Sequence, residues 1–165
     1  MKNTTLRYGI YAGLVLVALS IISTSFMYQL GYTMAEVLGY AGILIALSFI
    51  FFGLRHYRDV QNAGHLKFGE GLKLGTLITL LPSTFMFVWS ILFFAIWGDE
   101  FQVWADAHYQ ESMSSAEYVA YQEQLTQMGN LYTNPFFQGL IMFLTVFILG
   151  FIVTIISTLI LQKKA

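Results

Sequence analysis

The chain has 165 residues, of which 57% are hydrophobic and only 10% charged, and its formal net charge is −1. Soluble domains carry about 25% charged residues, because their surfaces must stay dispersed in water. This shortage of charge excludes a soluble enzyme, a basic nucleic-acid-binding protein and a disordered tail. The absence of cysteine excludes disulfides, thiolate metal sites and a cysteine nucleophile. We therefore expect a single integral membrane domain over residues 1–165.

Four stretches of the chain are apolar and nearly free of charge, and each is long enough for a membrane span. An α-helix rises about 1.5 Å per residue, so about 20 apolar residues cross a hydrocarbon core of about 30 Å. The sequence therefore predicts an all-α fold, a four-helix transmembrane bundle. The predicted spans are residues 8–28, 35–54, 74–97 and 136–161.

The first span shares one feature with a cleaved signal peptide, since Lys2 and Arg7 precede its apolar run. Two other features favour an uncleaved helix. The apolar run, of about 20 residues, exceeds a typical signal-peptide core, and only Ser23, Thr24 and Ser25 offer a weak cleavage site. We expect the span to be retained.

All eight Lys and Arg residues fall in three segments that four spans would place on one side of the membrane. These segments are the N-terminus, the loop between the second and third spans, and the C-terminus with Lys163 and Lys164. That side also holds Asp59 and Glu70, so it carries +6, while the seven remaining carboxylates give the other side −7. The positive-inside rule then places both termini in the cytoplasm.

The outer loop, residues 98–134, is too long for a turn, and we expect two short amphipathic helices in it. The first has apolar side chains at positions i, i+3, i+4 and i+7 and polar side chains on the opposite face. We expect the polar face to be solvated. The apolar positions are Phe101, Trp104, Ala105 and His108, and the polar positions are Asp99, Gln102, Asp106 and Gln110.

The second short helix of the outer loop is predicted from the signals at its ends. Ser114 and Glu117 have the spacing of a capping box, and Gly129 ends the pattern. Asn134 before Pro135 is a start signal for the fourth span. We expect the apolar stripe of this helix to dock on the chain's own bundle, with the membrane surface or a partner as alternatives. The stripe consists of Tyr118, Tyr121, Leu125 and Met128.

The inner loop, between the second and third spans, is rich in cations and glycines. Cations beside a cytoplasmic leaflet are able to contact anionic lipid headgroups, each contributing about 1 kcal/mol, although they could equally serve only to set the topology. The glycines predict a tight re-entry into the third span, and the lack of a Gly-Lys-Ser/Thr motif disfavours nucleotide binding. The candidate headgroup contacts are Arg55, Arg58, Lys67 and Lys73, and the glycines are Gly64, Gly69, Gly71 and Gly75.

The predicted spans carry no Asp, Glu, Lys, Arg or His near their middle. Ion-coupled transporters normally need such groups at the midplane, so a pump is disfavoured. Asp106, His108 and Glu111 are close in sequence but do not share a helix face well, so we expect no metal site. The sequence also has no Gly-x-Ser-x-Gly elbow, and we expect no catalytic residue and no cofactor.

Small residues recur at four-residue spacing in three of the spans, a pattern that allows helix backbones to approach closely. We expect packing within the monomer, with a homodimer face as the alternative. Pro82 frees the carbonyl of Ile78 and predicts a kink, where Ser83 or Thr84 would help to satisfy the backbone. The candidate packing residues are Gly9, Gly13, Gly71, Gly75, Gly150 and Thr154, followed by Thr158.

Three segments carry glycines and basic residues in a distinctive order. They are Lys2-Asn3-Thr4 with Tyr8-Gly9 and Ala12-Gly13-Leu14; Arg55 with Tyr57-Arg58, Gly64, Lys67-Phe68-Gly69, Gly71 and Gly75; and Gly150 to Ser157 with Leu161 to Lys164. In these segments, and over nearly its whole length, the chain resembles the bacterial membrane proteins grouped as domain of unknown function 4199. The outer loop fits least well. The resemblance implies a small four-helix inner-membrane protein of Bacteroidetes-type bacteria, and it implies no activity and no catalytic residue.

The spans without ionisable groups and the sizeable outer loop favour a non-enzymatic protein, a structural or accessory component of the bacterial inner membrane. Its expected partners are the lipid bilayer and either a second copy or another membrane protein, and not nucleic acid. One alternative is a small oligomeric channel or facilitator for an uncharged or lipidic solute. A third interpretation is a membrane-embedded enzyme that acts on lipid headgroups through the loop from Arg55 to Lys73.

Overall fold

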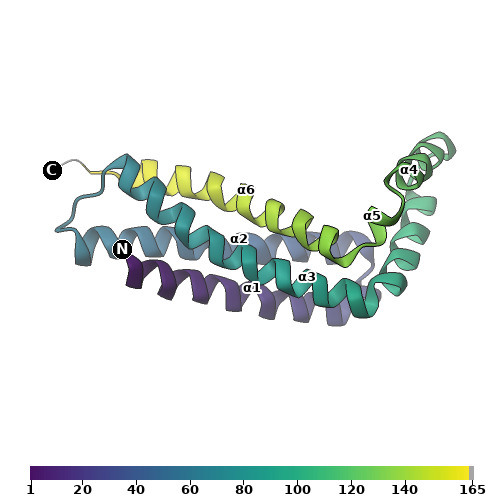
Figure 1. The fold of residues 1–165 in the computed structure, drawn as a ribbon, viewed down its shortest axis with the longest axis horizontal. Helices are drawn as coiled ribbons and strands as arrows, with labels where there is room; N and C mark the ends of the chain where they lie inside the picture. The colour runs from purple at the N-terminus through teal and green to yellow at the C-terminus, as the bar shows by residue number, and fades with distance from the viewer. Residues whose placement is uncertain (164–165) are drawn as a thin grey trace. The chain divides into compact units, whose positions relative to one another are not determined.

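A computed structural model describes residues 1–163 of the chain, which are helical almost throughout (Figure 1). The helices alternate with short connections, and one π-helical turn, η1, follows α2. Four of the helices are long and apolar enough to cross a membrane. The elements are α1 (Lys2–Leu30), α2 (Tyr32–His56), η1 (Tyr57–Gln61), α3 (Phe68–Ser112), α4 (Ser115–Met128), α5 (Asn130–Thr133) and α6 (Pro135–Leu161).

The chain divides into two compact units. Unit 1 comprises Met1–Met86 together with the chain from Phe143 onward, and unit 2 comprises Phe87–Met142. Helices α3 and α6 each contribute residues to both units. Unit 1 therefore contains α1, α2, η1 and parts of α3 and α6, whereas unit 2 contains α4 and α5 with the remaining parts.

In unit 1, α1 and α2 form a helical hairpin with a single residue between them (Figure 1). That residue, Gly31, has φ 78°, a backbone conformation that glycine adopts without steric cost. Its N–H donates to the carbonyl of Met27 at 3.1 Å and so caps α1. The second span begins at Tyr32 rather than at residue 35, because a one-residue turn leaves no linker.

Side chains of helix α3 lie directly against glycines of three other helices of unit 1. Gly9 of α1 lies against Leu81, Gly53 of α2 against Ile78, and Gly150 of α6 against Thr79. At each glycine, a Cβ atom would lie within 3 Å of the facing side chain. The core of unit 1 therefore surrounds α3, and it is built on close helix approach.

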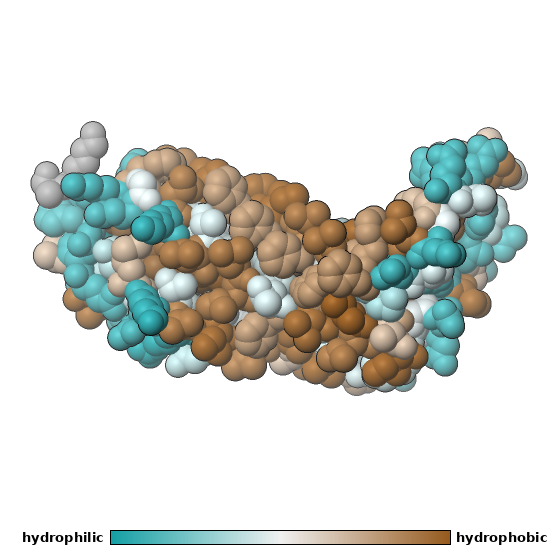
Figure 2. Space-filling model, in the orientation of Figure 1, coloured by the Kyte–Doolittle hydropathy of each residue, from teal (hydrophilic) through white to brown (hydrophobic). Residues whose placement is uncertain are grey.

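Large apolar side chains cover much of the outside of the long helices (Figure 2). Leu14 is 55% exposed, Leu44 57% and Ile160 66%. An aqueous surface does not tolerate contiguous apolar area of this kind, whereas lipid tails do. The exposure pattern therefore matches the four-span prediction, which the helix lengths also confirm.

The third long helix does not stop at residue 97, as the sequence predicted, but continues through Gly98 to Ser112. Aromatic contacts bridge the predicted boundary: the ring centroids of Phe93 and Phe101 are 5.7 Å apart, and those of Phe94 and Phe101 are 5.6 Å apart. The apolar face thus continues in register past Gly98, and these contacts favour a helix that continues through this residue. The first predicted short helix is the end of α3, and only the second, α4, is separate.

Pro82 lies inside α3, and the helix is continuous across it. The Ser83 hydroxyl donates to the carbonyl of Thr79 at 2.9 Å, and the Thr84 hydroxyl donates to that of Leu80 at 2.8 Å. Both hydroxyls therefore bind the carbonyl four residues earlier, and not the Ile78 carbonyl that Pro82 leaves without its helical donor.

Candidate functional site: the basic end and the outer subdomain

Three segments that are far apart in the sequence meet at one end of unit 1, which we call the basic end (Figure 1). The inner loop, residues 57–67, connects them. Gln61 Oε1 accepts from the Thr4 hydroxyl at 3.0 Å and from the N-terminal ammonium at 3.4 Å. The guanidinium of Arg58 donates to the carbonyl of Leu161 at 3.4 Å. The two ends of the described chain are thus tied to the same loop.

Leu66 and Lys163 complete the basic end by forming an isolated antiparallel bridge. The N–H of each residue donates to the carbonyl of the other at 3.0 Å. Leu66 is fully buried, so the loop contributes an apolar side chain to the interior of unit 1. The bridge therefore holds the entry to α3 against the chain that leaves α6.

The turn of the inner loop depends on two residues with positive φ, Ala63 at 49° and Gly64 at 82°. The Gly64 N–H donates to the carbonyl of Arg58 at 2.8 Å, and the Asn62 side chain donates to the carbonyl of His65 at 2.8 Å. Of the four glycines that predicted a tight re-entry, only Gly64 uses its conformational freedom in this way.

Both carboxylates of the basic end are already occupied. Asp59 accepts from the Arg58 guanidinium at 2.6 Å, and it forms an ion pair with Arg55 at 3.6 Å. Glu70 accepts from the Asn62 side chain at 3.3 Å and from the backbone N–H of Lys67 at 3.2 Å. Neither carboxylate neutralises a lysine side chain within the described residues.

The four candidate headgroup contacts therefore fall into two pairs. Arg55 and Arg58 are bound to Asp59. The side chains of Lys67 and Lys73 are exposed, and within residues 1–163 they form no ion pair. Lys163 is also exposed. Lys164, which the topology prediction also used, lies outside the described residues.

The candidate packing residues all contact a neighbouring helix of unit 1. In α1, Gly9 faces Leu81 and Gly13 faces Phe85. In α3, Gly71 and Gly75 face threonines of α6, and Gly150 of α6 in turn faces Thr79 of α3. The hydroxyl oxygens of Thr79 and Thr154 lie 3.4 Å apart. The threonine opposite Gly71 is Thr158 and the one opposite Gly75 is Thr154.

Unit 2 contains an outer subdomain, formed by the end of α3 with α4 and α5. Asp106 of α3 accepts from the Tyr118 hydroxyl at 3.0 Å and from the Gln122 amide at 2.7 Å, both on α4. The Gln122 amide also donates to the Tyr118 hydroxyl at 3.0 Å. Asp106 is therefore not simply solvated, as its place on the polar face predicted. It is instead the acceptor that holds α4 against α3.

Tyrosines extend this contact along α4. The rings of Tyr109 and Tyr121 are 4.9 Å apart, and the hydroxyls of Tyr121 and Tyr132 lie 3.5 Å apart. Burial raises the pKa of Tyr121 and of Tyr118, and the bond to Asp106 raises that of Tyr118 further. Tyr118 and Tyr121 thus contact the end of α3 and Tyr132 within unit 2, whereas Met128 at the end of the stripe is exposed. Docking of the stripe on the four-helix bundle stays a prediction.

The capping box predicted for α4 is present. The Ser114 hydroxyl accepts from the backbone N–H of Glu117, and the Glu117 carboxylate accepts from the backbone N–H of Ser114 at 3.0 Å. The Ser114 hydroxyl also donates to the Glu117 carboxylate at 2.7 Å, and this bond, together with the one from the Ser114 N–H, holds the pKa of Glu117 below its ordinary value. Asn134 likewise caps α6, where its side chain accepts from the N–H of Phe136 at 2.9 Å.

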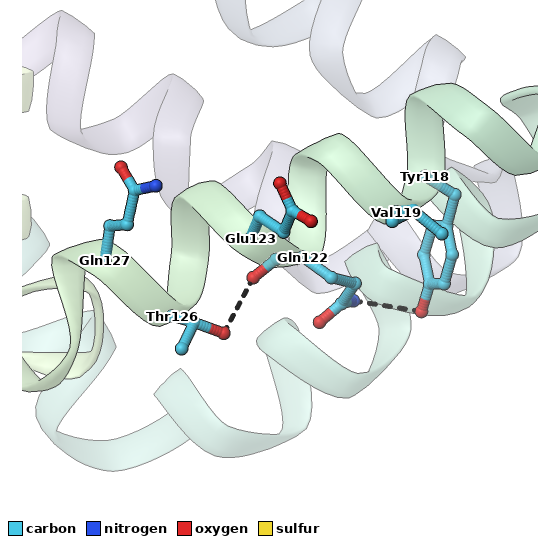
Figure 3. A pocket seen from close by; sticks show the side chains of 6 residues that line it. All are labelled: Tyr118, Val119, Gln122, Glu123, Thr126 and Gln127. Atoms are coloured by element: carbon cyan, nitrogen blue, oxygen red, sulfur yellow. Dashed lines mark hydrogen bonds between the residues drawn. The ribbon is translucent and has the colours of Figure 1, made fainter.

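A shallow hollow lies on the surface of α4 (Figure 3). All of its lining residues belong to this one helix, so no second element encloses it. Within it, the Gln122 amide donates to the Tyr118 hydroxyl and the Thr126 hydroxyl donates to the carbonyl of Gln122. Its polar groups are thus largely engaged with one another. The lining residues are Tyr118, Val119, Gln122, Glu123, Thr126 and Gln127.

Sequence reasoning did not identify the pairing of Asp106 with Tyr118 and Gln122. The four-residue spacing of Tyr118 and Gln122 places them on one face of α4, which was the available signal. The pairing itself requires the turn at residues 113–114. Over residues 1–163, no three His, Cys, Asp or Glu side chains are grouped so as to hold a metal ion.

Comparison with known proteins identifies a family but no characterised relative. The model of the family described as "Protein of unknown function (DUF4199)" matches residues 7–163, nearly the whole chain. No curated protein matches the chain, and no solved structure matches it.

Proposed function

This chain belongs to the DUF4199 family of proteins of unknown function, and we propose that it is a multi-pass protein of a bacterial inner membrane with a structural or accessory role and no enzymatic activity. In this proposal the helices anchor the chain, and the acidic outer subdomain contacts another membrane protein or a second copy. The observation that carries the proposal is the continuity of α3, which is part of both the packed bundle and the outer subdomain.

The length of α3 supports this role. The helix has 45 residues, whereas about 20 are enough to cross a hydrocarbon core of about 30 Å. The helix therefore has more residues than its span requires. Val103 and Val119 of the outer subdomain are 73% and 56% exposed, and residues 87–142 contain six carboxylates and no Lys or Arg. This surface suits a contact in which a partner supplies cations around an apolar centre.

The orientation is part of the proposal. The seven cations of the described residues all belong to unit 1, in the segments that form the basic end. Under the positive-inside rule, such an end faces the cytoplasm. Both termini are then cytoplasmic, and the outer subdomain is periplasmic.

Two reporters, each active on a different side of the membrane, test this orientation. Green fluorescent protein and alkaline phosphatase are fused in turn to the C-terminus, and the same pair is inserted between Met113 and Ser114. We expect fluorescence from the first position and phosphatase activity from the second. Phosphatase activity at the C-terminus would overturn the orientation.

Site-specific photocrosslinking in native membranes tests the accessory role. A crosslinking residue at Glu111, exposed in the outer subdomain, should capture a partner protein that mass spectrometry can identify. The same residue at Leu14, exposed on the apolar side of α1, is the matched control and should capture lipid. Recovery of no protein adduct at Glu111 contradicts the accessory role.

The buried hydroxyls of unit 1 favour one second candidate, a channel or facilitator for an uncharged solute. However, Thr79 and Thr154 contact each other, and each faces a glycine of the opposite helix. The space between α3 and α6 at these residues is therefore filled by side chains. A pathway would then have to form between copies of the chain. Solute flux through reconstituted liposomes would support this candidate, and liposomes that stay tight to a panel of solutes would count against it.

A further inference from the structure

The basic end combines exposed cations with exposed apolar side chains. Lys67 and Lys73 are exposed, and the neighbouring Phe68 is 42% exposed. Val60, in η1 at the start of the inner loop, is 68% exposed. Side chains of these two kinds occur together where a protein meets the boundary between headgroups and acyl chains. This combination distinguishes the basic end from a purely solvated charged surface.

The charges of the basic end are not balanced within the chain. Seven cations of the described residues face two carboxylates, Asp59 and Glu70. Asp59 is bound by Arg55 and Arg58, and Glu70 accepts hydrogen bonds from Asn62 and from the backbone of Lys67. Only Arg55 and Arg58 form ion pairs within residues 1–163, so most of the positive charge of the basic end is open to anions from outside the protein.

The backbone of the inner loop holds these cations in place. The bridge between Leu66 and Lys163 fixes the residue before Lys67, and the bond from the Lys67 N–H to Glu70 fixes the first turn of α3. Lys73 lies on the next turn of the same helix. The lysine side chains thus extend from a rigid base, which lowers the entropy lost when they bind a ligand.

From these observations we infer that the basic end binds the headgroups of anionic phospholipids, and that Lys67 and Lys73 are the recognising residues. Arg55 and Arg58 contribute less, because their charge is directed to Asp59. The inference rests on the proposed membrane function, and it adds the chemistry of the partner. The partner is a lipid whose phosphate-containing headgroup has a net negative charge and whose acyl chains contact Phe68 and Val60.

Native mass spectrometry of the full-length protein in detergent tests this inference. The protein is mixed with equal amounts of phosphatidylglycerol and phosphatidylcholine of identical acyl chains. Each cation near an anionic lipid surface contributes about 1 kcal/mol, or about fivefold in affinity. We expect phosphatidylglycerol to be preferred by at least tenfold, and the preference to fall as salt is raised from 20 to 500 mM, about the range over which screening becomes strong.

Matched variants assign the preference to residues. We expect Lys67→Gln with Lys73→Gln to remove most of it, and Lys67→Arg with Lys73→Arg to retain it. The single variants Lys67→Gln and Arg55→Gln change the net charge equally. We expect Lys67→Gln to lose more of the phosphatidylglycerol preference, which would separate recognition by the lysine from an effect of total charge. An equal loss in these two variants would overturn the assignment to the lysines.

Two control experiments separate headgroup recognition from binding of free phosphate and from misfolding. Glycerol phosphate, a headgroup without acyl chains, should not displace the lipid; displacement at equal concentration would show a site for free phosphate and overturn the inference. Thermal unfolding in detergent shows whether each variant is folded. If the double variant is unfolded, the single variants and the salt titration decide whether the lysines recognise the headgroup. Absence of the protein from membrane fractions contradicts the proposed function, whereas membrane insertion without headgroup preference contradicts only this inference.

Discussion

Leu66 and Lys163, 97 positions apart in the sequence, donate their backbone N–H groups to each other's carbonyl at 3.0 Å. They are the only bridged pair in the part of the chain that the structure describes. Because Leu66 is fully buried, the bridge is supported by packing as well as by hydrogen bonds. It connects the inner loop to the chain that follows α6, so Lys163 is part of the fold of the basic end.

Removal of residues 163–165 should open this bridge. We expect the amide of Leu66 to exchange with solvent at least tenfold faster, because its acceptor, the Lys163 carbonyl, is lost. Hydrogen exchange followed by mass spectrometry measures this rate. Removal of residues 164–165 alone is the matched control, since both bridge residues remain. Unchanged exchange at Leu66 in the longer deletion would contradict a stabilising role for the bridge.

Substitution of Gly75 should destabilise the bundle. In Gly75→Ala, the new Cβ would overlap with the Thr154 side chain, so one helix has to move. Overpacking of this kind costs about 2 kcal/mol, and we expect a lower unfolding temperature in detergent. Gly69→Ala is the control on the same helix, because no atom lies within 4 Å of its added Cβ. The second substitution Thr154→Gly should restore much of the loss, and failure to do so would contradict the contact.

Ser114→Ala should weaken the start of α4. The substitution removes the hydroxyl that accepts from the N–H of Glu117, and loss of an N-cap costs about 1 kcal/mol. Amide exchange in the first turn of α4 should become faster. The neighbouring Ser115→Ala is the control, since Ser115 is already inside the helix and no capping bond is lost. Equal effects of the two substitutions would refute the capping assignment.

Acidification should weaken the same helix end. Hydrogen bonds from Ser114 hold the pKa of Glu117 below its ordinary value of 4.5. A lowered pKa in the folded state contributes stability above pH 4.5, and this contribution is lost as the pH falls through the folded value. We expect exchange in the first turn of α4 to accelerate below pH 4.5, after correction for intrinsic rates. The acceleration should be absent in Glu117→Gln.

Asp106→Asn should change the titration of Tyr118. The phenol has a pKa raised by burial and by its bond to the Asp106 carboxylate, so replacing that carboxylate should lower the pKa toward 10. Because the folded-state pKa is raised, the contact between α3 and α4 is stable below pH 10 and is lost as the pH rises through the folded value. Carbon NMR of labelled tyrosine measures the titration. Glu111→Gln, which changes an exposed carboxylate on the same helix, is the control.

Much of the fold was accessible from the sequence because membrane spans obey simple rules. An apolar stretch of about 20 residues without charge has few alternatives to a spanning helix, and all four long helices were predicted in order. The capping signals at Ser114 and Asn134 depend only on neighbouring residues, and they were also correct. The end of α3 was placed wrongly, because the aromatic contacts across Gly98 outweigh the polar residues that follow it.

The pairings between distant residues were not accessible in the same way. Sequence spacing put Asp106 on a polar face, but only the fold of α4 back onto α3 turned that face toward Tyr118 and Gln122. The four basic residues between the second and third predicted spans were equivalent as a sequence pattern. The structure separates them, since Asp59 lies within reach of Arg55 and Arg58 and not of Lys67 or Lys73.

The low share of charged residues, 10%, was therefore the most informative property of the sequence by itself. It indicated the spans and the separation of positive from negative segments, because burial of charge near the middle of a bilayer is costly. Which cations remain available to a ligand was decided only by the tertiary structure. Ion pairs and hydrogen bonds act over a few ångströms, and only folding brings such groups that close.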